Sequence, residues 1–243
     1  ACGLALASKV SVALLIPVMA VAAGLSYRAR RGAMPLAGFA IALAATLLAF
    51  RVAQPYAFSG TGFFDLRPSL LFLGNVETQR RMADGSLEFP YTLQWAGTIP
   101  YLFPLQNLFW GLGPPFLAAA LGGAALAVFQ LIRERRLEHL LVLLWVGLAF
   151  VYFGGQMVKY MRYLLPIYPF LALLAAYLLV TWVRGLGQGQ GSRVKGQGPS
   201  PLDPEPWTLN PAVVPALVVL LGTLLWAWAF TGLYTRPLTR VEA

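Results

Sequence analysis

The chain has few of the side chains that metal centres and nucleophilic enzymes need. Its 243 residues include one cysteine, Cys2, and one histidine, His139. A single cysteine excludes a disulfide within the chain. One cysteine and one histidine are also too few ligands for a Cys/His zinc site, and they do not form a Cys–His couple with a local signature. No cofactor site is evident. Acidic side chains are the remaining source of ligands for a divalent cation, and none has the spacing of a metal site.

Charge is also scarce. Charged residues make up 11% of the chain and hydrophobic residues 58%, whereas soluble domains carry about 25% charged and about 45–50% apolar residues. The composition therefore predicts an all-α polytopic membrane protein. The net charge of +9 does not indicate nucleic-acid binding, because the cations are scattered at the ends of apolar runs. Lys and Arg at such places set orientation and snorkel to the interface.

The N-terminal sequence has no charged region ahead of its apolar residues. The chain begins Ala-Cys-Gly and runs directly into an apolar stretch, so we expect no signal peptide. We expect instead that an N-terminal part of a longer protein precedes it.

Six apolar runs are long enough to cross a bilayer, which takes about 20 mostly apolar residues. They lie at 8–26, 33–53, 112–132, 139–156, 162–183 and 211–233. Residues 1–183 form the predicted membrane domain, and residues 211–243 form the last membrane helix and tail. The segment 184–210 is rich in Gly, Gln and Pro, which predicts a flexible linker.

Basic connections predict the orientation. Arginines concentrate at 27–32 and 133–138, and further cations follow at 184–210. The positive-inside rule places these three connections in the cytoplasm. The protein is then integral to the cytoplasmic membrane, with the loop 54–111 and the connection 157–161 on the outer face.

The loop 54–111 is too long for a simple connector and too aromatic for a disordered one. Residues 68–83 predict a short amphipathic helix along the membrane surface, with Asp65 as its cap, Pro68 in its first turn and Gly85 at its stop. The remainder, through 111, is punctuated by prolines and predicts extended or turn-like backbone.

Four carboxylates in this loop are candidates for a general base or a sugar-hydroxyl ligand. Capping explains Asp65 and solvation explains Glu77 and Asp84, whereas Glu88 lies in an apolar context without a helix to cap. Residues Asp65, Glu88, Gln94 and Trp95 are the candidates for substrate contact in the loop.

Three cations near the predicted outer ends of spans stand beside tyrosines. They are Lys9 and, in the stretch KYMRYLLPIYPF, Lys159 and Arg162. Snorkelling explains any one of them. As a group with Tyr163, they predict a clamp for a lipid phosphate, because Arg offers a bidentate fork and Lys a compact charge.

Two stretches resemble polytopic glycosyltransferases of the GT-C fold, the group of protein O-mannosyltransferases, aminoarabinose transferases and family-39-like relatives. GLALASKVSVALLIPVM is similar to their G-L-A-x-x-[ST]-K span, and KYMRYLLPIYPFLALLAAYLL to their K-x-x-R-Y-L-L-P-x-x-P span. The likeness covers most of residues 1–183. The loop pieces RVAQPYAF and QWAGTIPYLFPLQNLFWGLGPP resemble a subgroup of these proteins.

The resemblance implies transfer of a sugar from a polyprenyl-phosphate-linked donor on the outer face. It implies donor-phosphate contacts for Lys9, Lys159 and Arg162. The family's main catalytic Asp has no counterpart in this sequence, so the catalytic residue is unassigned and residues 1–243 alone are expected to be inactive. Two alternatives remain open: a flippase or transporter of lipid-linked sugars, and a non-catalytic membrane assembly subunit. The oligomeric state is undecided.

Overall fold

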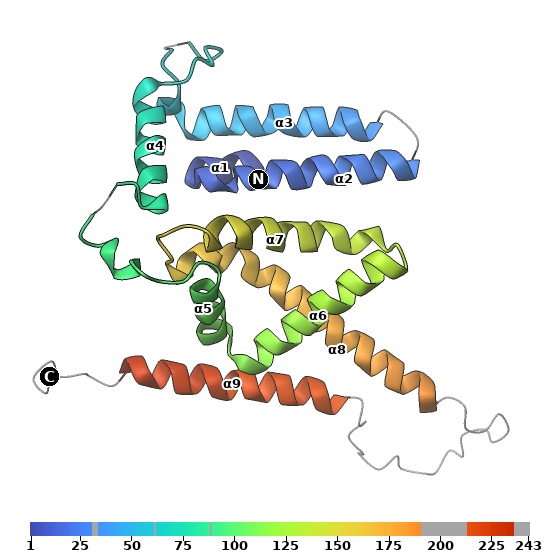
Figure 1. Ribbon diagram of the computed structural model, residues 1–243. Coiled ribbons are helices and arrows are strands. Elements are labelled where there is room, and N and C mark those ends of the chain that lie inside the picture. Colours follow the sequence, from blue (N-terminus) through green and yellow to red (C-terminus); the bar gives the residue numbers. More distant parts are fainter. Residues whose placement is uncertain (31–33, 61, 88, 191–212, 236–243) are drawn as a thin grey trace, which may run out of the picture. The chain divides into compact units, whose positions relative to one another are not determined.

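The computed structural model describes residues 1–30, 34–60, 62–87, 89–190 and 213–235 (Figure 1). The regular secondary structure in these ranges consists of helices joined by loops, without a β-strand. Phe58 and Pro68 form one isolated antiparallel bridge. The α-helices are α1 Cys2–Ser8, α2 Leu15–Arg30, α3 Met34–Ala53, α4 Leu70–Asp84, α5 Leu102–Leu112, α6 Pro114–Arg133, α7 Leu140–Gly154, α8 Tyr168–Gln190 and α9 Val214–Thr235. Short 3₁₀ helices are η1 Val10–Leu14, η2 Pro55–Ala57, η3 Leu93–Trp95, η4 Leu137–His139 and η5 Met161–Ile167.

Six helical segments in these ranges are long and apolar enough to cross a membrane, which confirms the predicted all-α polytopic class. They are Val10–Ala29, Met34–Ala53, Pro114–Arg133, Leu137–Gly154, Met161–Gly185 and Val214–Gly232. The boundaries agree with the predicted spans to within a few residues, because the apolar runs themselves set the helix lengths. Helix α8 continues to Gln190, into the predicted linker 184–210, and residues 191–210 lie outside the described ranges.

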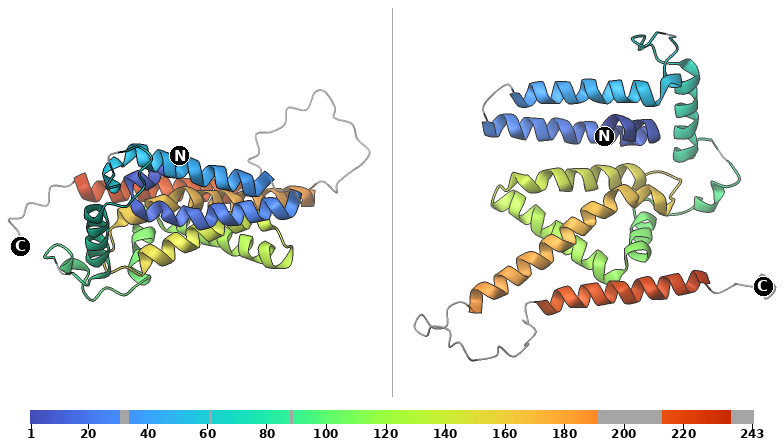
Figure 2. Two further views of the ribbon diagram at one scale, coloured as in Figure 1. Left: turned by 90° about the horizontal axis from the view of Figure 1, so that it is seen from above. Right: turned by 180° about the vertical axis from the view of Figure 1, so that it is seen from behind.

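The chain divides into two compact units, one of residues 1–104 and 136–164, the other of residues 105–135 and 165–243. In unit 1, α3 packs against both α1 and α2, and α2 also contacts α7. The views in Figures 1 and 2 agree that α2 and α3 run side by side. Gly3 lets α1 approach α3 closely, since a Cβ at this position would overlap the carbonyl oxygen of Thr46.

The helix predicted at 68–83 is α4, which crosses the direction of α3 within unit 1 (Figure 1). Its cap differs from the prediction. The side chain of Ser69, not Asp65, accepts the hydrogen bond from the Phe72 amide. Pro68 precedes the cap and pairs with Phe58 in the isolated bridge. The predicted stop is confirmed, because Gly85 ends the helix in the left-handed conformation with φ 86°.

The stretch around LFPLQNLFWGL was predicted to be extended or turn-like and is instead helix α5. Its proline, Pro104, stands in the first turn, where a missing N–H costs no hydrogen bond. Positive φ angles bracket the helix, 62° at Tyr101 and 84° at Gly113. The prolines therefore mark the start of a helix rather than prevent one.

Unit 2 is organised by the crossing of α6 and α8, its most extensive helix contact. Gly123 allows the close approach, since a Cβ there would overlap the backbone of Leu174. The Tyr177 hydroxyl donates a hydrogen bond to the side-chain oxygen of Gln130, a buried polar group on α6. Helix α9 packs on α6, and its Trp226 indole donates to the Trp110 carbonyl oxygen at 3.0 Å.

Candidate functional site

Lys9 occupies a break in the first helical segment of unit 1. Its backbone is extended (φ −154°, ψ 114°), which ends α1 and starts η1. The Lys9 amide still donates to the Ala5 carbonyl at 2.9 Å, and the Lys9 carbonyl accepts from the Val12 amide at 3.0 Å. The break therefore costs no backbone hydrogen bond at Lys9. It turns the side chain toward the end of α7.

Two aromatic rings hold the Lys9 ammonium. The Nζ atom lies 4.7 Å from the ring centroid of Phe153 and 4.4 Å from that of Tyr163. Both distances lie within the range of cation–π attraction, about 6 Å. A lysine that snorkels makes its contacts with water, whereas these two rings hold the Lys9 ammonium in a fixed position.

Arg162 stands next to this pair. Its guanidinium carbon lies 4.4 Å from the Tyr160 ring and 5.9 Å from the Tyr163 ring. Tyr163 is therefore shared by both cations, although Lys9 and Arg162 are far apart in the sequence. The structure brings together three of the four predicted phosphate contacts: Lys9, Arg162 and Tyr163.

The two cations repel each other. Burial, and then the positive charge of Arg162, lowers the pKa of Lys9 below its ordinary value. In the part of the chain that the structure describes, neither cation forms an ion pair; the carboxylates Asp65 and Glu77 are paired with Arg67 and Arg80 instead. Two like charges without a carboxylate between them favour a bound anion, which would remove the repulsion.

A cavity of about 800 Å³ opens beside Lys9 and Tyr163. This is within the usual size of small-molecule sites, about 300–1,000 Å³. Its polar lining includes Ser8, Ser11, Asn75, Gln79, Arg80 and Gln156, and its apolar lining includes Val10, Ala13, Leu14, Pro17 and Val76. The Ser11 hydroxyl is buried and has no hydrogen-bond partner among the described residues. We call this space the Lys9 cavity.

The lining suits an amphiphile. Asn75 and Gln79 stand four residues apart on α4 and so share one face, which offers amide donors and acceptors opposite Lys9. The residues of η1 and early α2 that line the cavity belong to a membrane-spanning segment. A ligand with a polar anionic end and an apolar end would find a surface for each.

The fourth predicted phosphate contact, Lys159, lies elsewhere. Its side chain is buried, with 5% exposed, and its ammonium donates to Thr98 Oγ1 at 2.9 Å and to the Met157 carbonyl oxygen at 3.1 Å. Burial lowers the pKa of Lys159. Lys159 does not line the Lys9 cavity. Its hydrogen bond to Thr98 ties the connection after α7 to the loop before α5, which is a structural role.

The loop candidates are not gathered at the cavity. Asp65 binds Arg67 through a 2.7 Å ion pair, and this hydrogen bonding lowers the pKa of the Asp65 carboxyl. Gln94 is exposed and donates to the Tyr91 carbonyl oxygen. Trp95 is buried against Tyr160, with ring centroids 4.3 Å apart. Glu88 lies outside the described residues.

Several cavity residues were missed from the sequence. Asn75 and Gln79 carried a signal, since their spacing places them on one face of the predicted helix. Ser11, Tyr56 and Gln156 carried none, because only the tertiary structure brings them to Lys9.

The described residues contain no group of three or more His, Cys, Asp or Glu side chains that could hold a metal ion. The chemistry available at the Lys9 cavity is therefore that of cations, amides, hydroxyls and aromatic rings. In proteins, groups of these kinds bind and orient anions.

Comparison with known proteins leaves the family open. No family model, no curated protein and no solved structure matches the chain.

Proposed function

We propose that this chain supplies the lipid-phosphate site of an integral-membrane glycosyltransferase, which moves a sugar from a polyprenyl-phosphate-linked donor to an acceptor on the outer membrane face. The observation that carries the proposal is the convergence of Lys9 and Arg162 on Tyr163, beside the Lys9 cavity, where no carboxylate of the described residues is ion-paired with either of these two cations. The donor's phosphate would lie at these cations.

The residues that line the Lys9 cavity also suggest where the sugar and the prenyl chain of the donor would lie. The amides on α4 and the Gln156 side chain are hydrogen-bonding groups of the kind that bind sugar hydroxyls. The prenyl chain would follow the apolar residues of η1 and α2 toward the bilayer. In this arrangement the chain holds and orients the donor. Lys9 and Arg162 would also stabilise the negative charge that develops on the phosphate when the sugar leaves.

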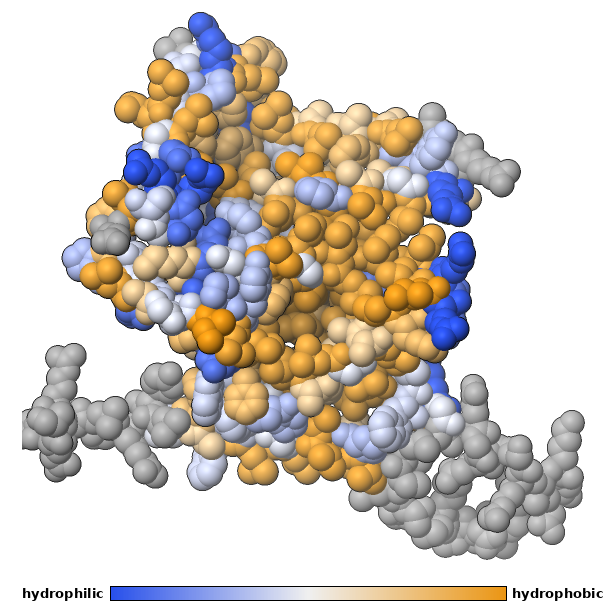
Figure 3. All heavy atoms as spheres, viewed as in Figure 1, coloured by the Kyte–Doolittle hydropathy of each residue, from blue (hydrophilic) through white to orange (hydrophobic). Residues whose placement is uncertain are grey.

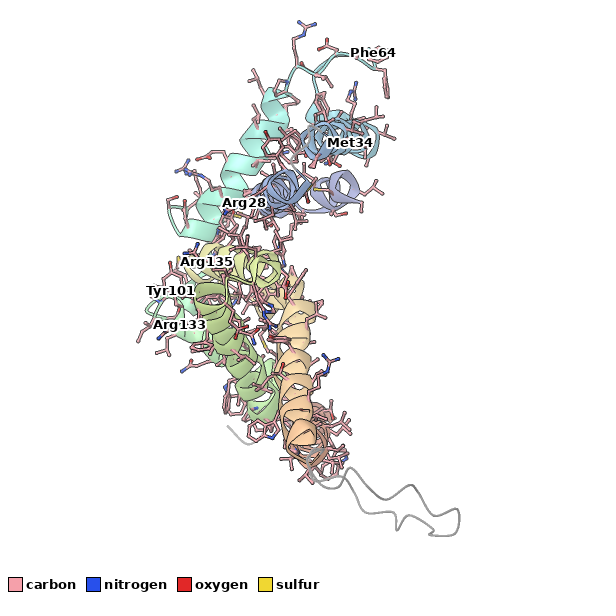
Figure 4. All side chains as sticks on the ribbon, turned by 90° about the vertical axis from the view of Figure 1, so that its right-hand side faces the viewer. Arg28, Met34, Phe64, Tyr101, Arg133 and Arg135 are labelled. Carbon is pink, nitrogen blue, oxygen red and sulfur yellow. The ribbon has the colours of Figure 1, made fainter. Side chains whose placement is uncertain are left out.

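Binding tests the first half of the proposal. The chain in nanodiscs is titrated with a polyprenyl-phosphate sugar, in the wild type and in the Lys9→Ala and Arg162→Ala variants. Arg28→Ala is the matched control, because it removes an exposed cation from the other end of α2 in unit 1 (Figure 4). We expect weaker binding in Lys9→Ala and in Arg162→Ala, and unchanged binding in the control. Equal binding in all four proteins would overturn the phosphate site.

An assay of sugar transfer tests the second half of the proposal, the glycosyltransferase activity. Proteoliposomes that contain the longest natural form of the protein are supplied with labelled donor. Sugar transfer that depends on Lys9 supports the glycosyltransferase, and movement of intact donor between leaflets without transfer favours the transporter. If donor binds but is neither transferred nor translocated, the protein is a non-catalytic subunit.

A further inference from the structure

An exposed hydrophobic loop tip lies directly beyond α3 in unit 1. It consists of residues 62–66 and is followed by the first turn of α4. Phe64 is 90% exposed, and Leu70 and Leu71 are 84% and 80% exposed. Phe63 and Leu66 are also exposed. Large apolar side chains grouped in this way mark an interaction surface.

The loop is held rigidly rather than left loose. Arg51, in the last turn of α3, is buried and donates to the carbonyl oxygens of four loop residues. The acceptors and distances are Phe63 at 3.2 Å, Pro55 at 3.3 Å, Gly62 at 3.0 Å and Gly60 at 3.5 Å. The Arg51 guanidinium also lies 4.9 Å from the Phe58 ring. One side chain thus sets the shape of the loop.

Arg51 also sets the depth of the tip. It stands two residues before the end of the membrane-spanning segment Met34–Ala53. Because its guanidinium bonds the Gly62 and Phe63 carbonyls directly, the tip is fixed beside the end of α3, at the level where that helix leaves the bilayer. Figure 1 shows the loop beside this end of α3, on the side away from α2. Phe64 projects beyond the α2–α3 pair in Figure 4.

The surroundings of the tip match the membrane interface. The exposed apolar surface of α3, which includes Ile41, Leu48 and Val52, leads to it, and Figure 3 shows hydrophobic side chains along this helix and on the loop. Residues 54–64 contain no charged side chain. Asp65, within the tip, is ion-paired at 2.7 Å with the exposed Arg67, so its charge is not left without a partner beside the apolar side chains.

We propose that the loop tip, with Leu70 and Leu71, is a membrane anchor that inserts into the boundary between lipid headgroups and acyl chains. Its partner is the lipid surface around α3. Insertion reaches about 5–10 Å below the headgroups, as for other interfacial elements. The anchor also holds α4 against the membrane surface, since α4 begins four residues after the tip.

The single cysteine of the chain makes the test direct. In a Cys2→Ser background, an environment-sensitive fluorophore is attached to Phe64→Cys, to Ile41→Cys as a control near the middle of the span, or to Thr78→Cys as a control at an exposed position of α4. The full chain is reconstituted into phosphatidylethanolamine–phosphatidylglycerol vesicles. These carry nitroxide lipids labelled near the headgroup or in the middle of the acyl chain, and iodide serves as the aqueous quencher.

The expected result is quenching of the label at position 64 by the shallow nitroxide, with less quenching by the deep nitroxide and little by iodide. The label at 41 should respond most to the deep nitroxide, and the label at 78 to iodide. Quenching at 64 by iodide alone would overturn the proposal, because the tip would then be in water. Protection at 64 from all three quenchers would also overturn it, because a protein surface would then cover the tip.

Discussion

Lys9 lines the cavity, whereas Arg162 stands beside it across the shared Tyr163 ring, so the two charges should affect ligand affinity by different amounts. Lys9 is half-buried between two rings, whereas Arg162 is exposed. A charge-assisted contact from a partly buried group contributes about 1.5–3 kcal/mol, so Lys9→Gln should weaken polyprenyl-phosphate binding roughly 10- to 150-fold. An exposed charge contributes about 0.2–1 kcal/mol, so Arg162→Gln should weaken it at most about fivefold.

Salt separates the two effects further. The Debye length falls from about 8 Å at 0.15 M to about 3 Å at 1 M ionic strength, so high salt should remove most of the Arg162 contribution and leave most of that of Lys9. The assay is a titration of a short-chain polyprenyl phosphate into the protein in a neutral detergent, at both salt concentrations. Arg28→Gln is the matched control. A Lys9→Gln affinity equal to that of the control would refute the reasoning.

Three further predictions address single contacts. Because burial and Arg162 lower the pKa of Lys9, ligand affinity should begin to fall with rising pH earlier than the titration of an ordinary lysine would predict. The Lys9→Arg variant should flatten this profile in the same titration, and parallel profiles of the two proteins would contradict the prediction. The Lys159→Met variant should bind the ligand like the wild type but melt at a lower temperature, because the loss of the hydrogen bonds from Lys159 to Thr98 and Met157 costs about 1–3 kcal/mol. A loss of ligand binding without a lower melting temperature would contradict the structural role of Lys159. Arg51→Gln should expose residues 55–63 to limited proteolysis, because four carbonyl groups lose their donor; a digestion pattern identical to that of the wild type would contradict the clamp.

The membrane helices could be predicted because their signal is local. A run of about 20 apolar residues needs no distant partner to be read as a span, and all six runs are helices of that length. The errors also have local causes. Ser69 caps α4 because it stands one residue before the helix, whereas the Asp65 carboxylate is taken by Arg67. Pro104 starts α5 because a proline is tolerated in the first turn.

The candidate site could be predicted only in part. Lys9, Arg162 and Tyr163 were identified because cations and tyrosines at span ends are conspicuous in a sequence of low charge. Lys159 has the same local appearance, and its burial by Thr98 depends on a loop about sixty residues away. The buried Arg51 was missed because its acceptors are backbone carbonyls, which carry no sequence signal. Tertiary contacts, not residue type, distinguish Lys9 and Arg162, which share the Tyr163 ring, from the buried Lys159.

Photo-crosslinking with a diazirine-bearing polyprenyl phosphate tests the central claim most directly, because it reports where the ligand lies. We expect labelled peptides around residues 8–17, 75–83 and 152–163, and loss of this labelling in Lys9→Gln but not in Arg28→Gln. Labelling spread over the lipid-facing surfaces of α3 and α9, with no dependence on Lys9, would contradict it.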